Sequence, residues 1–221
     1  VSGSTMQRSG IDTGISASQA ERLIEDGPDK PFLALRVEDT QKATIVGAFG
    51  YALHTVDGGK HWISLDTQLK NPIGLHYYGI EKTAEGLLFV GEQGIVQRQI
   101  TGSEFLVETP SEGTLFGVLS LGNQVLIAYG LRGKVVRSQD DGKTWSKLDS
   151  GVEASIQAGV VLPDGALLLV AENGQMISSH DRGSTFNLLP TRSPPTADVL
   201  SVSANSLLVV GPLGAQTITV P

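Results

Sequence analysis

The hydrophobic positions of this chain fall in short runs that glycine, proline and charged residues interrupt. The longest runs, ALLLVA at 166–171 and SLLVVG at 206–211, have the length of buried strands. Helical periodicity is scarce, and no run approaches the roughly 18 to 20 apolar residues that a membrane-spanning helix needs. The pattern therefore predicts an all-β protein without a transmembrane segment.

One pattern closes five of the apolar runs: Gly or Ala, two variable residues, and then Gly. The runs are IVGAFG (45–50), FVGEQG (89–94), IAYGLRG (127–133), LVAENG (169–174) and VVGPLG (209–214). Their final glycines follow one another at steps of 44, 39, 41 and 40 residues. A period near 41 residues is typical of β-propeller blades with four strands each.

The strands of one blade can be placed inside each period. An innermost strand precedes each Gly-x-x-Gly run, which forms the second strand and a tight hairpin into the third. A short fourth strand follows. This places complete blades at 31–67, 73–109, 113–150 and 155–192, and a partial blade without its fourth strand at 197–221.

The segment 1–30 has a different pattern from the blades. Residues 1–16 are rich in serine, glycine and threonine, as linkers are. Ser18 and Glu21 form a capping-box pattern, and Gly27 and Pro28 form a stop signal. We therefore expect a linker and one short helix over 18–26.

The partial last blade raises the question of how the ring closes. Propellers commonly pair both chain ends in one blade, which removes exposed strand edges. Residues 1–15 contain no convincing strand for this purpose. Either a poor strand there closes a five-bladed ring, or the five visible blades are part of a larger, seven-bladed one; we favour a fragment or a ring that another chain completes. The start at Val1, without an initiator Met or signal-peptide pattern, also indicates a mature form or a fragment.

A second motif, Ser/Thr-x-Asp-x-Gly-x-(Thr/His)-aromatic, follows the third strand in three repeats. Its residues are Thr55, Asp57, Gly59 and Trp62; Ser138, Asp140, Gly142 and Trp145; and Ser179, Asp181, Gly183 and Phe186. An Asp carboxylate accepts backbone N–H bonds in its own turn, and the aromatic ring is expected to bury against the blade. The repeat at 98–105 has Ile100 in the Asp position, so we expect the carboxylate to serve folding and not catalysis.

Charge and composition exclude several functions. The net charge is −7, with 16 basic and 23 acidic residues, which disfavours a nucleic-acid partner. The absence of cysteine excludes disulfides and thiolate metal sites. No two histidines (His54, His61, His76, His180) share metal-ligand spacing, and Asp140-Asp141-Gly142 lacks the distal Glu of a calcium loop. We expect no metal and no cofactor.

The three Asp motifs resemble the Asp-box, or BNR, repeat of sialidases and related propellers. The blade period, the V-G-x-x-G turn, and the phrases DGGKHW and DDGKTW are most similar to photosystem II stability/assembly factor-like propellers, over about residues 31–221. That resemblance implies a non-catalytic assembly or interaction factor in the periplasm or a thylakoid lumen, with a membrane-complex subunit or envelope protein as its partner. It also implies seven blades. Photosynthetic members carry arginine-rich client patches, whereas the eight arginines here are scattered, so their client does not carry over.

In a propeller, the Gly-x-x-Gly turns share a face with the loops between blades, and that face usually binds ligands. The candidate partner residues there are Phe49, Glu92, Gln93, Leu131, Arg132, Glu172, Asn173 and Leu213. This mixture of apolar and charged side chains is typical of protein–protein contact.

The alternative is a sialidase-like glycoside hydrolase or a carbohydrate-binding propeller. Sialidase chemistry needs three clustered arginines, a Tyr nucleophile with a Glu neighbour, and an acidic Asp. The candidates are Arg36, Arg98, Arg132, Arg137, Tyr77 and Tyr78. Arg36 and Tyr78 are expected to line the central channel, but Arg98 and Arg137 lie in third strands, away from it. The sequence therefore predicts no arginine cluster and no enzyme.

Overall fold

The computed structural model describes residues 27, 30–66, 68–101, 104–108 and 112–220. The helix expected over 18–26 and a closing strand within 1–15 lie outside the described residues. No described helix is long and apolar enough to cross a membrane.

The described chain is a series of consecutive antiparallel sheets. The first consists of β1 (Phe32–Val37), β2 (Ala43–Gly47), β3 (Ala52–Thr55) and β4 (Ile63–Ser64). The second consists of β5 (Tyr77–Lys82), β6 (Leu87–Gly91), β7 (Val96–Thr101) and β8 (Glu104–Glu108). The third consists of β9 (Leu115–Ser120), β10 (Leu126–Gly130), β11 (Val135–Ser138) and β12 (Ser146–Leu148). The fourth consists of β13 (Ile156–Val161), β14 (Leu167–Ala171), β15 (Gln175–Ser179) and β16 (Asn187–Arg192). The fifth has three strands: β17 (Asp198–Ser203), β18 (Ser206–Gly211) and β19 (Gly214–Thr219).

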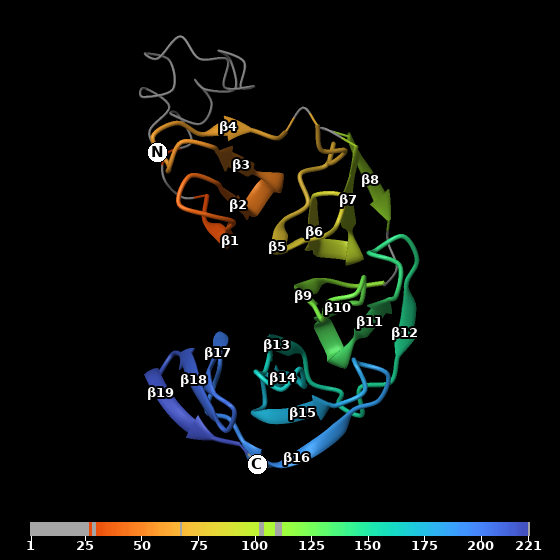
Figure 1. The fold of residues 1–221 in the computed structure, drawn as a ribbon, viewed down its shortest axis with the longest axis vertical. Coiled ribbons are helices and arrows are strands. Elements are labelled where there is room, and N and C mark those ends of the chain that lie inside the picture. Colours follow the sequence, from red (N-terminus) through yellow and green to blue (C-terminus); the bar gives the residue numbers. More distant parts are fainter. Residues whose placement is uncertain (1–26, 28–29, 67, 102–103, 109–111, 221) are drawn as a thin grey trace.

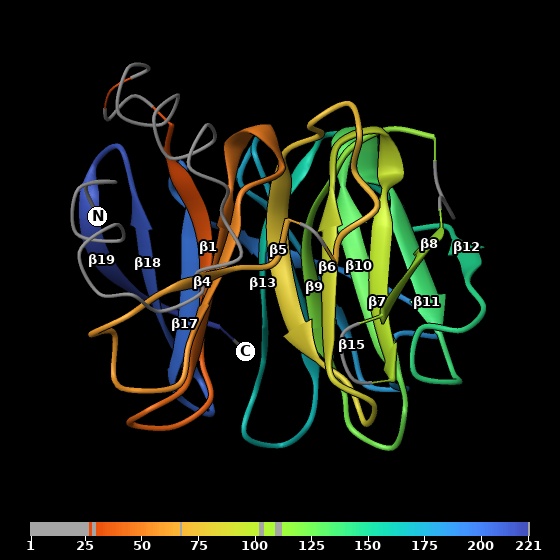
Figure 2. The ribbon, with the colours of Figure 1, turned by 90° about the horizontal axis from the view of Figure 1, so that it is seen from above.

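These sheets are the five blades of a propeller, and each follows the strand order that the repeat predicts. Figure 1 shows them side by side around an arc, with β1, β5, β9, β13 and β17 innermost. Seen at right angles, the strands run across the thickness of the disc (Figure 2). Successive hairpins of a blade therefore alternate between the two faces of the disc.

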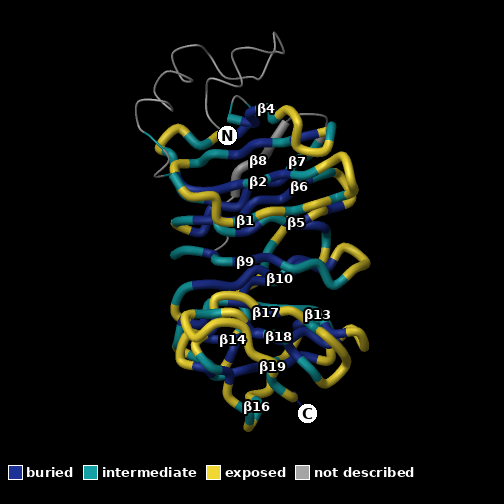
Figure 3. Tube along the Cα trace, turned by 90° about the vertical axis from the view of Figure 1, so that its left-hand side faces the viewer, coloured by how far each residue is buried: buried dark blue, intermediate teal, exposed yellow. Residues whose placement is uncertain are grey.

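The hydrophobic core lies between neighbouring blades. Val46 of the first blade packs with Phe89 of the second, and Leu88 of the second packs with Leu126 of the third. Similar clusters join the third blade to the fourth and the fourth to the fifth. All five positions of β6, β10 and β14 are buried, because a blade covers each side of these sheets (Figure 3).

The two end blades each keep one uncovered sheet face, because the arc stays open between β1 and β17–β19 (Figure 1). On β1, Leu35 and Val37 are 61% and 63% exposed, and on β17, Leu200 and Val202 are 55% and 62% exposed. Interior blades bury such side chains against a neighbour. The described residues therefore form five consecutive blades without ring closure.

In four of the five turns, the first residue of the motif is a glycine that allows two backbone segments to come close together. A Cβ atom on Gly47, Gly91, Gly130 or Gly211 would lie only 2.3, 2.0, 2.1 or 2.0 Å from a carbonyl oxygen just ahead of the innermost strand. Such distances are far below van der Waals contact, so a side chain does not fit there without a shift of the backbone. The fourth blade has Ala171 at this position and keeps the contact between the Glu172 N–H and the Ser155 carbonyl at 2.8 Å.

Candidate functional site

The Gly-x-x-Gly turns of the first three blades hold a non-glycine residue in the left-handed region. Phe49, Gln93 and Arg132 have φ of 57°, 54° and 56°, each just before the final glycine. An L-residue in this conformation is disfavoured by roughly 1–2 kcal/mol. The sequence predicts a tight hairpin here but gives no signal that the residue before the final glycine is also left-handed.

These turns contact the loops that enter the blades. The backbone N–H groups of Ala48, Glu92 and Leu131 donate to the carbonyl oxygens of Pro31, His76 and Thr114 at 3.0, 3.0 and 2.9 Å, respectively. The turns and these loops therefore share one face of the disc, which we name the Gly-turn face. The turns following the third strands lie at the opposite ends of those strands, on the Asp-turn face.

Four aromatic side chains, which we name the aromatic row, follow one another on the Gly-turn face. The ring of Phe49 lies 5.1 Å from that of His76, and the His76 ring lies 6.3 Å from that of Tyr78. Tyr78 and Phe116 are 5.6 Å apart, edge to face at 88°. The row therefore runs from the first blade across the second to the third.

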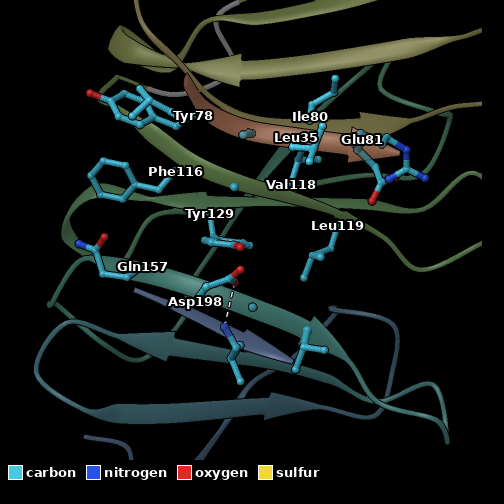
Figure 4. A pocket seen from close by; sticks show the side chains of 18 of the residues that line it. Leu35, Tyr78, Ile80, Glu81, Phe116, Val118, Leu119, Tyr129, Gln157 and Asp198 are labelled. Carbon is cyan, nitrogen blue, oxygen red and sulfur yellow. Dashed lines mark hydrogen bonds and ion pairs between the residues drawn. The ribbon is translucent and has the colours of Figure 1, made fainter. Parts of the chain in front are cut away.

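A repeated irregularity in the innermost strands turns one side chain of each strand toward the central channel. The pairing between first and second strands skips one residue in each of the first four blades. The skipped residues are Leu33, Tyr78, Phe116 and Gln157, and all four line the central channel. Figure 4 shows Tyr78, Phe116 and Gln157 together at one end of the channel. A bulge re-aims a side chain in this way.

The channel is a cavity of about 930 Å³ lined by the innermost strands of all five blades. An ion pair between Arg36 and Glu81 lies toward its other end, where the second carboxylate oxygen of Glu81 accepts the Ser120 N–H at 3.1 Å. Tyr129 lines the cavity between the two ends, and burial, with a smaller effect from Asp198, raises the pKa of its hydroxyl. The two ends of the channel thus differ: one is aromatic and the other is ionic.

Two polar side chains beside the aromatic row make no hydrogen bond within the described part of the chain: the Tyr78 hydroxyl and the Gln157 amide. Both side chains are half-buried. Burial, and to a lesser extent the Glu92 carboxylate, raises the pKa of Tyr78, so its hydroxyl remains a hydrogen-bond donor at neutral pH. These groups can therefore bond to a ligand that rests on the row.

The carboxylates of the Gly-turn face are mostly engaged. Glu92 accepts the His76 N–H at 2.8 Å, and Glu172 accepts the Ser155 N–H at 3.2 Å. The Arg132 guanidinium, by contrast, is exposed and has no partner among the described residues. Glu92 and Glu172 remain anionic while they accept these bonds, so this part of the face offers a ligand one cation without a partner beside carboxylates that are already hydrogen-bonded.

Lys30 adds a second positive charge at the Phe49 end of the row. Its ammonium group lies 5.7 Å from the ring centre of Phe49 and 5.5 Å from that of Tyr51, and it donates to the Tyr51 hydroxyl at 3.4 Å. Both ends of the row therefore carry a cation.

The remaining candidate partner residues are spread along the Gly-turn face. Gln93 is exposed and Leu131 is half-buried in their turns. Asn173 forms a tight local turn, in which its side-chain oxygen accepts the Gln175 N–H at 3.0 Å. Leu213 is exposed in the two-residue hairpin between β18 and β19. None of these four side chains belongs to the aromatic row.

The Asp motifs on the opposite face form closed hydrogen-bond networks. In each motif the Ser or Thr hydroxyl donates to the carboxylates of Asp57, Asp140 and Asp181 at 2.9, 2.8 and 2.7 Å. The same oxygen of each carboxylate accepts the backbone N–H of His61, Thr144 or Thr185 at 2.9, 2.8 and 2.9 Å.

The hydroxyl oxygens of these motifs also accept a backbone N–H. Gly59, Gly142 and Gly183 are the donors, at 3.0, 2.8 and 2.8 Å from Thr55, Ser138 and Ser179, respectively. The second carboxylate oxygens contact the side chains of His61, Thr144 and Thr185, so the hydroxyl oxygen and both carboxylate oxygens of each motif are used within its own turn.

These hydrogen bonds lower the pKa of all three carboxyl groups. Bonds from the His61 backbone and side chain bring the pKa of Asp57 to about 2. For Asp140, partial burial opposes the effect, but the Thr144 hydroxyl and backbone still lower the pKa. The Thr185 hydroxyl and backbone lower the pKa of Asp181. Each carboxylate is therefore ionised at neutral pH and is a poor general acid.

The aromatic residues of the motifs differ in their packing. Trp145 packs against the core between the second and third blades, and its indole N–H donates to the Gly142 carbonyl at 3.1 Å. Phe186 packs against the core between the third and fourth blades, and Trp62 is half-buried. In the repeat at 98–105, which has Ile100 in the Asp position, residues 102–103 lie outside the described residues.

The residue before the motif glycine, which the sequence analysis did not single out, joins two blades. Asp141 and Arg182 have positive φ of 63° and 60°. The Asp141 carboxylate accepts the Ala84 N–H at 2.7 Å, and the Arg182 guanidinium donates to the Gly122 carbonyl at 2.6 Å. Ala84 and Gly122 each belong to the blade that precedes the turn. The Asp turns thus connect blades as well as strands.

The structure does not bring the sialidase candidates together. Arg36 and Tyr78 line the channel as expected, but the Arg36 guanidinium pairs with Glu81. Arg98 in β7 pairs with Glu85 at 2.5 Å. The Arg137 side chain in β11 bonds to the Arg182 carbonyl at 2.9 Å.

The second tyrosine candidate is equally unsuited. Tyr77 is fully buried, and its hydroxyl accepts a hydrogen bond from the Gln97 side chain at 2.5 Å. Within the described residues, no group of three His, Asp or Glu side chains is placed to hold a metal ion.

Comparison with known proteins rests on structure alone. No protein-family model and no curated protein sequence matches the chain. The chain is similar to YCF48 bound to D1 peptide, with a TM-score of 0.62 and 16% identity over 86% of this chain and 67% of that one. It is similar to YCF48 from Cyanidioschyzon merolae, with a TM-score of 0.60 and 15% identity over 83% of this chain and 65% of that one. The fold is a β-propeller.

Two further similar structures show how widely this fold is used. The WD40 β-propeller domain of Doa1 has a TM-score of 0.66 and 12% identity, over 87% of this chain and 66% of that one. An ancestral GH74 enzyme has a TM-score of 0.59 and 13% identity, over 80% of this chain and 28% of that one. The chain therefore spans about two thirds of the YCF48 and Doa1 chains and a smaller part of the enzyme. At such identities the likeness concerns the fold.

Proposed function

We propose that this chain is part of a non-catalytic propeller that binds protein segments on its Gly-turn face. The observation that carries the proposal is a difference between the two faces in whether their side-chain groups have partners within the chain. The Gly-turn face presents aromatic rings, a hydroxyl, an amide and a guanidinium that have no hydrogen-bond or ionic partner within the described chain, whereas the Asp-turn face uses its polar groups internally. Aromatic rings and Arg are the groups that contribute most to protein interfaces.

The similar structures support a binding role. YCF48 has been solved with a D1 peptide, and WD40 propellers share the architecture. We extend the proposal to an assembly factor that supports biogenesis of an exported or membrane complex, acting in the periplasm or in a thylakoid-lumen type of compartment. The Asp-box and V-G-x-x-G motifs, through their resemblance to photosystem II assembly factor-like propellers, are the support for that extension.

The experiment is a selection of binding peptides from a random library displayed on phage, with the purified chain as bait. We expect enriched sequences that bind the chain as synthetic peptides in solution. Competition among the selected peptides would show whether they share one site. A library without any reproducible binder would contradict the proposal.

The second candidate function is carbohydrate binding or cleavage, which the GH74 likeness favours. Glycoside cleavage commonly uses two carboxyl groups of different pKa. In the channel, Glu81 is committed to Arg36 and to the Ser120 N–H, so it is not free to act as a general acid. Turnover of a fluorogenic sialoside or of a soluble polysaccharide by the purified chain would support this candidate over the first.

A further inference from the structure

The spacing of the aromatic row matches the repeat of an extended peptide. The successive ring centres are 5.1, 6.3 and 5.6 Å apart. In an extended strand, alternate side chains project to the same side and are about 6.6 Å apart, since the rise is about 3.3 Å per residue. A short extended segment could therefore place each second side chain against a successive ring.

The orientation of the rings favours peptide side chains over sugars. Neighbouring rings are tilted by 59°, 48° and 88°. They form notches between ring faces and ring edges, and they do not form the coplanar platform on which a chain of flat sugar rings would stack. Leucine and valine side chains fill such notches, and a phenylalanine ring also gains the edge-to-face contacts that aromatic rings prefer.

The polar groups beside the row can satisfy the backbone of such a segment. An extended peptide bound outside a sheet brings its own N–H and C=O groups, which need partners. The Tyr78 hydroxyl can donate to a carbonyl, and the Gln157 amide can both donate and accept. Figure 4 shows both side chains at the same end of the channel, on either side of Phe116.

The charge at the far end of the row indicates the chemistry of the segment. Arg132 occupies in the third blade the turn position that Phe49 occupies in the first, and both have positive φ. The Arg132 backbone N–H donates to the Ser155 hydroxyl at 3.4 Å, two residues before Gln157. The Arg132 turn therefore lies past Phe116 along the rim, and its exposed guanidinium, which has no partner in the described chain, can pair with a carboxylate of the segment.

We propose that the aromatic row and Arg132 bind an extended peptide segment with apolar side chains at alternate positions, followed by an acidic residue or a C-terminal carboxylate. This rests on the proposed function, because it names the partner chemistry for the same face. The row supplies most of the affinity, and Arg132 fixes the direction in which the segment lies.

The test uses a fluorescein-labelled heptapeptide with Leu, Phe and Leu at alternate positions, Ser between them and Asp at the end, and measures fluorescence anisotropy with the whole chain. One control peptide has the same composition with its three apolar residues adjacent. A second control replaces the Asp with Asn and has an amidated C-terminus. We expect the alternating peptide to bind at least about tenfold more tightly than the adjacent one.

Three variants locate the site. Phe116→Ala removes the last ring of the row, between Tyr78 and the Arg132 turn, and we expect a loss of affinity of about tenfold or more, as for aromatic anchors that become buried on binding. Phe49→Gly removes a ring at a position where the backbone conformation favours glycine, so we expect this variant to fold. It keeps the test possible if Phe116→Ala does not fold. Arg132→Gln should lower the affinity for the peptide that ends in Asp and leave the affinity for the amidated Asn peptide unchanged.

The matched control is Leu188→Ala, which removes an exposed apolar side chain from the outer strand β16. We expect this variant to bind the probe as the unchanged chain does. If library peptides bind but neither Phe116→Ala nor Phe49→Gly weakens them, the site is elsewhere; the inference is then wrong, while the proposed function stands.

Three other results would also overturn the inference. If neither the heptapeptide nor any library peptide binds, the proposed function fails together with it. If a soluble oligosaccharide displaces the heptapeptide at the row, the occupant is a carbohydrate. If Phe116→Ala abolishes self-association in sedimentation while no peptide binds, the row is a contact between copies of this chain.

Discussion

On the Asp-turn face, each motif carboxylate accepts several hydrogen bonds, and the neighbouring Asp141 and Arg182 side chains reach across to the preceding blade. On the Gly-turn face, the equivalent turns hold Phe49 and Arg132 in a disfavoured backbone conformation, and they leave the Arg132 guanidinium without a partner in the described chain. Both faces are produced by the same repeat. The Asp-turn face uses its polar side chains to connect blades, whereas the Gly-turn face leaves aromatic and polar side chains without hydrogen-bond or ionic partners in the described chain, which is why we propose it as the binding face.

This difference shows how a repeat can separate stability from binding. A motif that recurs and closes its own hydrogen bonds is a poor indicator of function, however conspicuous its Asp and Trp residues are. The side chains that differ between equivalent positions, such as Phe49, Gln93 and Arg132, are the ones that vary the surface while the turn remains the same. The following predictions test whether the two faces are as separate as this comparison implies.

The largest effect is expected from Gly183→Val on the Asp-turn face. Gly183 has φ of +75°, and a Cβ there would lie 2.4 Å from the terminal carbon of Ile127, which is fully buried and cannot move aside freely. Backbone strain and overpacking together should lower the free energy of unfolding by about 3 kcal/mol or more. Urea unfolding measures this loss.

Gly122→Ala is the control for this prediction. Gly122 has φ of +73° on the same face, but a Cβ there would have no atom within 4 Å beyond its chain neighbours. Only the backbone preference is lost, which amounts to about 1 kcal/mol. Equal losses at both positions would mean that the contact with Ile127 contributes nothing.

A smaller loss is expected from Asp140→Ala. The carboxylate accepts bonds from the Ser138 and Thr144 hydroxyls and from two backbone N–H groups, and these donors would lose their partner. Because the turn is partly exposed and water can replace some of these bonds, we expect a loss of about 1–2 kcal/mol in the free energy of unfolding. Arg132→Ala on the Gly-turn face should change the free energy of unfolding by less than about 0.5 kcal/mol.

Thermal or urea unfolding of both variants distinguishes the faces. Indistinguishable stabilities for Asp140→Ala and the unchanged chain would remove the structural interpretation of the Asp motif. Trp145→Ala serves as a second probe, since its ring packs against the core between two blades and its indole N–H bonds to Gly142.

The sequence predicted most of the fold because the physical signals were local and repeated. The innermost strand expected at the start of the blade at 31–67 corresponds to β1, and the Gly-x-x-Gly spacing placed all five second strands. A close backbone approach favours glycine at the first position of the turn in four blades, and Ala171 occupies it in the fourth, so a small residue there is a reliable marker. Tyr78 and Arg36 were correctly placed in the channel.

The binding surface was harder to predict because it depends on contacts between blades. Phe49, His76 and Phe116 are separated by 27 and 40 residues in the sequence, and only the arc brings their rings onto one rim. The candidate list included Phe49 and Arg132 because they lie in the turns. It omitted Phe116, since the skipped residue in an innermost strand is invisible in the alternation of the sequence, and it omitted His76, which lies in the loop that enters the second blade and not in a Gly-x-x-Gly turn.

The third prediction concerns Phe49→Gly on the Gly-turn face. This change relieves the left-handed conformation and removes an exposed ring, so the free energy of unfolding should rise by up to about 1 kcal/mol or stay unchanged. The flexibility that glycine adds to the unfolded chain limits the gain. Unfolding in urea measures the change. A loss above about 1 kcal/mol would show that the ring packs for stability, and the separation of the two faces would then be incomplete.

The smallest effect is a pH dependence that belongs to the Asp-turn face alone. Hydrogen bonds from His61 hold the pKa of Asp57 at about 2, below its ordinary value of 3.8. A lowered folded-state pKa means that the carboxylate stabilises the fold above the unfolded-state pKa, and that this contribution is lost as the pH falls toward 2.

Asp57→Asn lacks the charge at every pH. The difference in melting temperature between the unchanged chain and Asp57→Asn should therefore shrink as the pH falls from about pH 4 to pH 2. The corresponding difference for Arg132→Gln should not follow that curve, because no lowered carboxyl pKa among the described residues depends on Arg132. Parallel pH curves for the two variants would mean that the acid sensitivity does not come from the Asp turn.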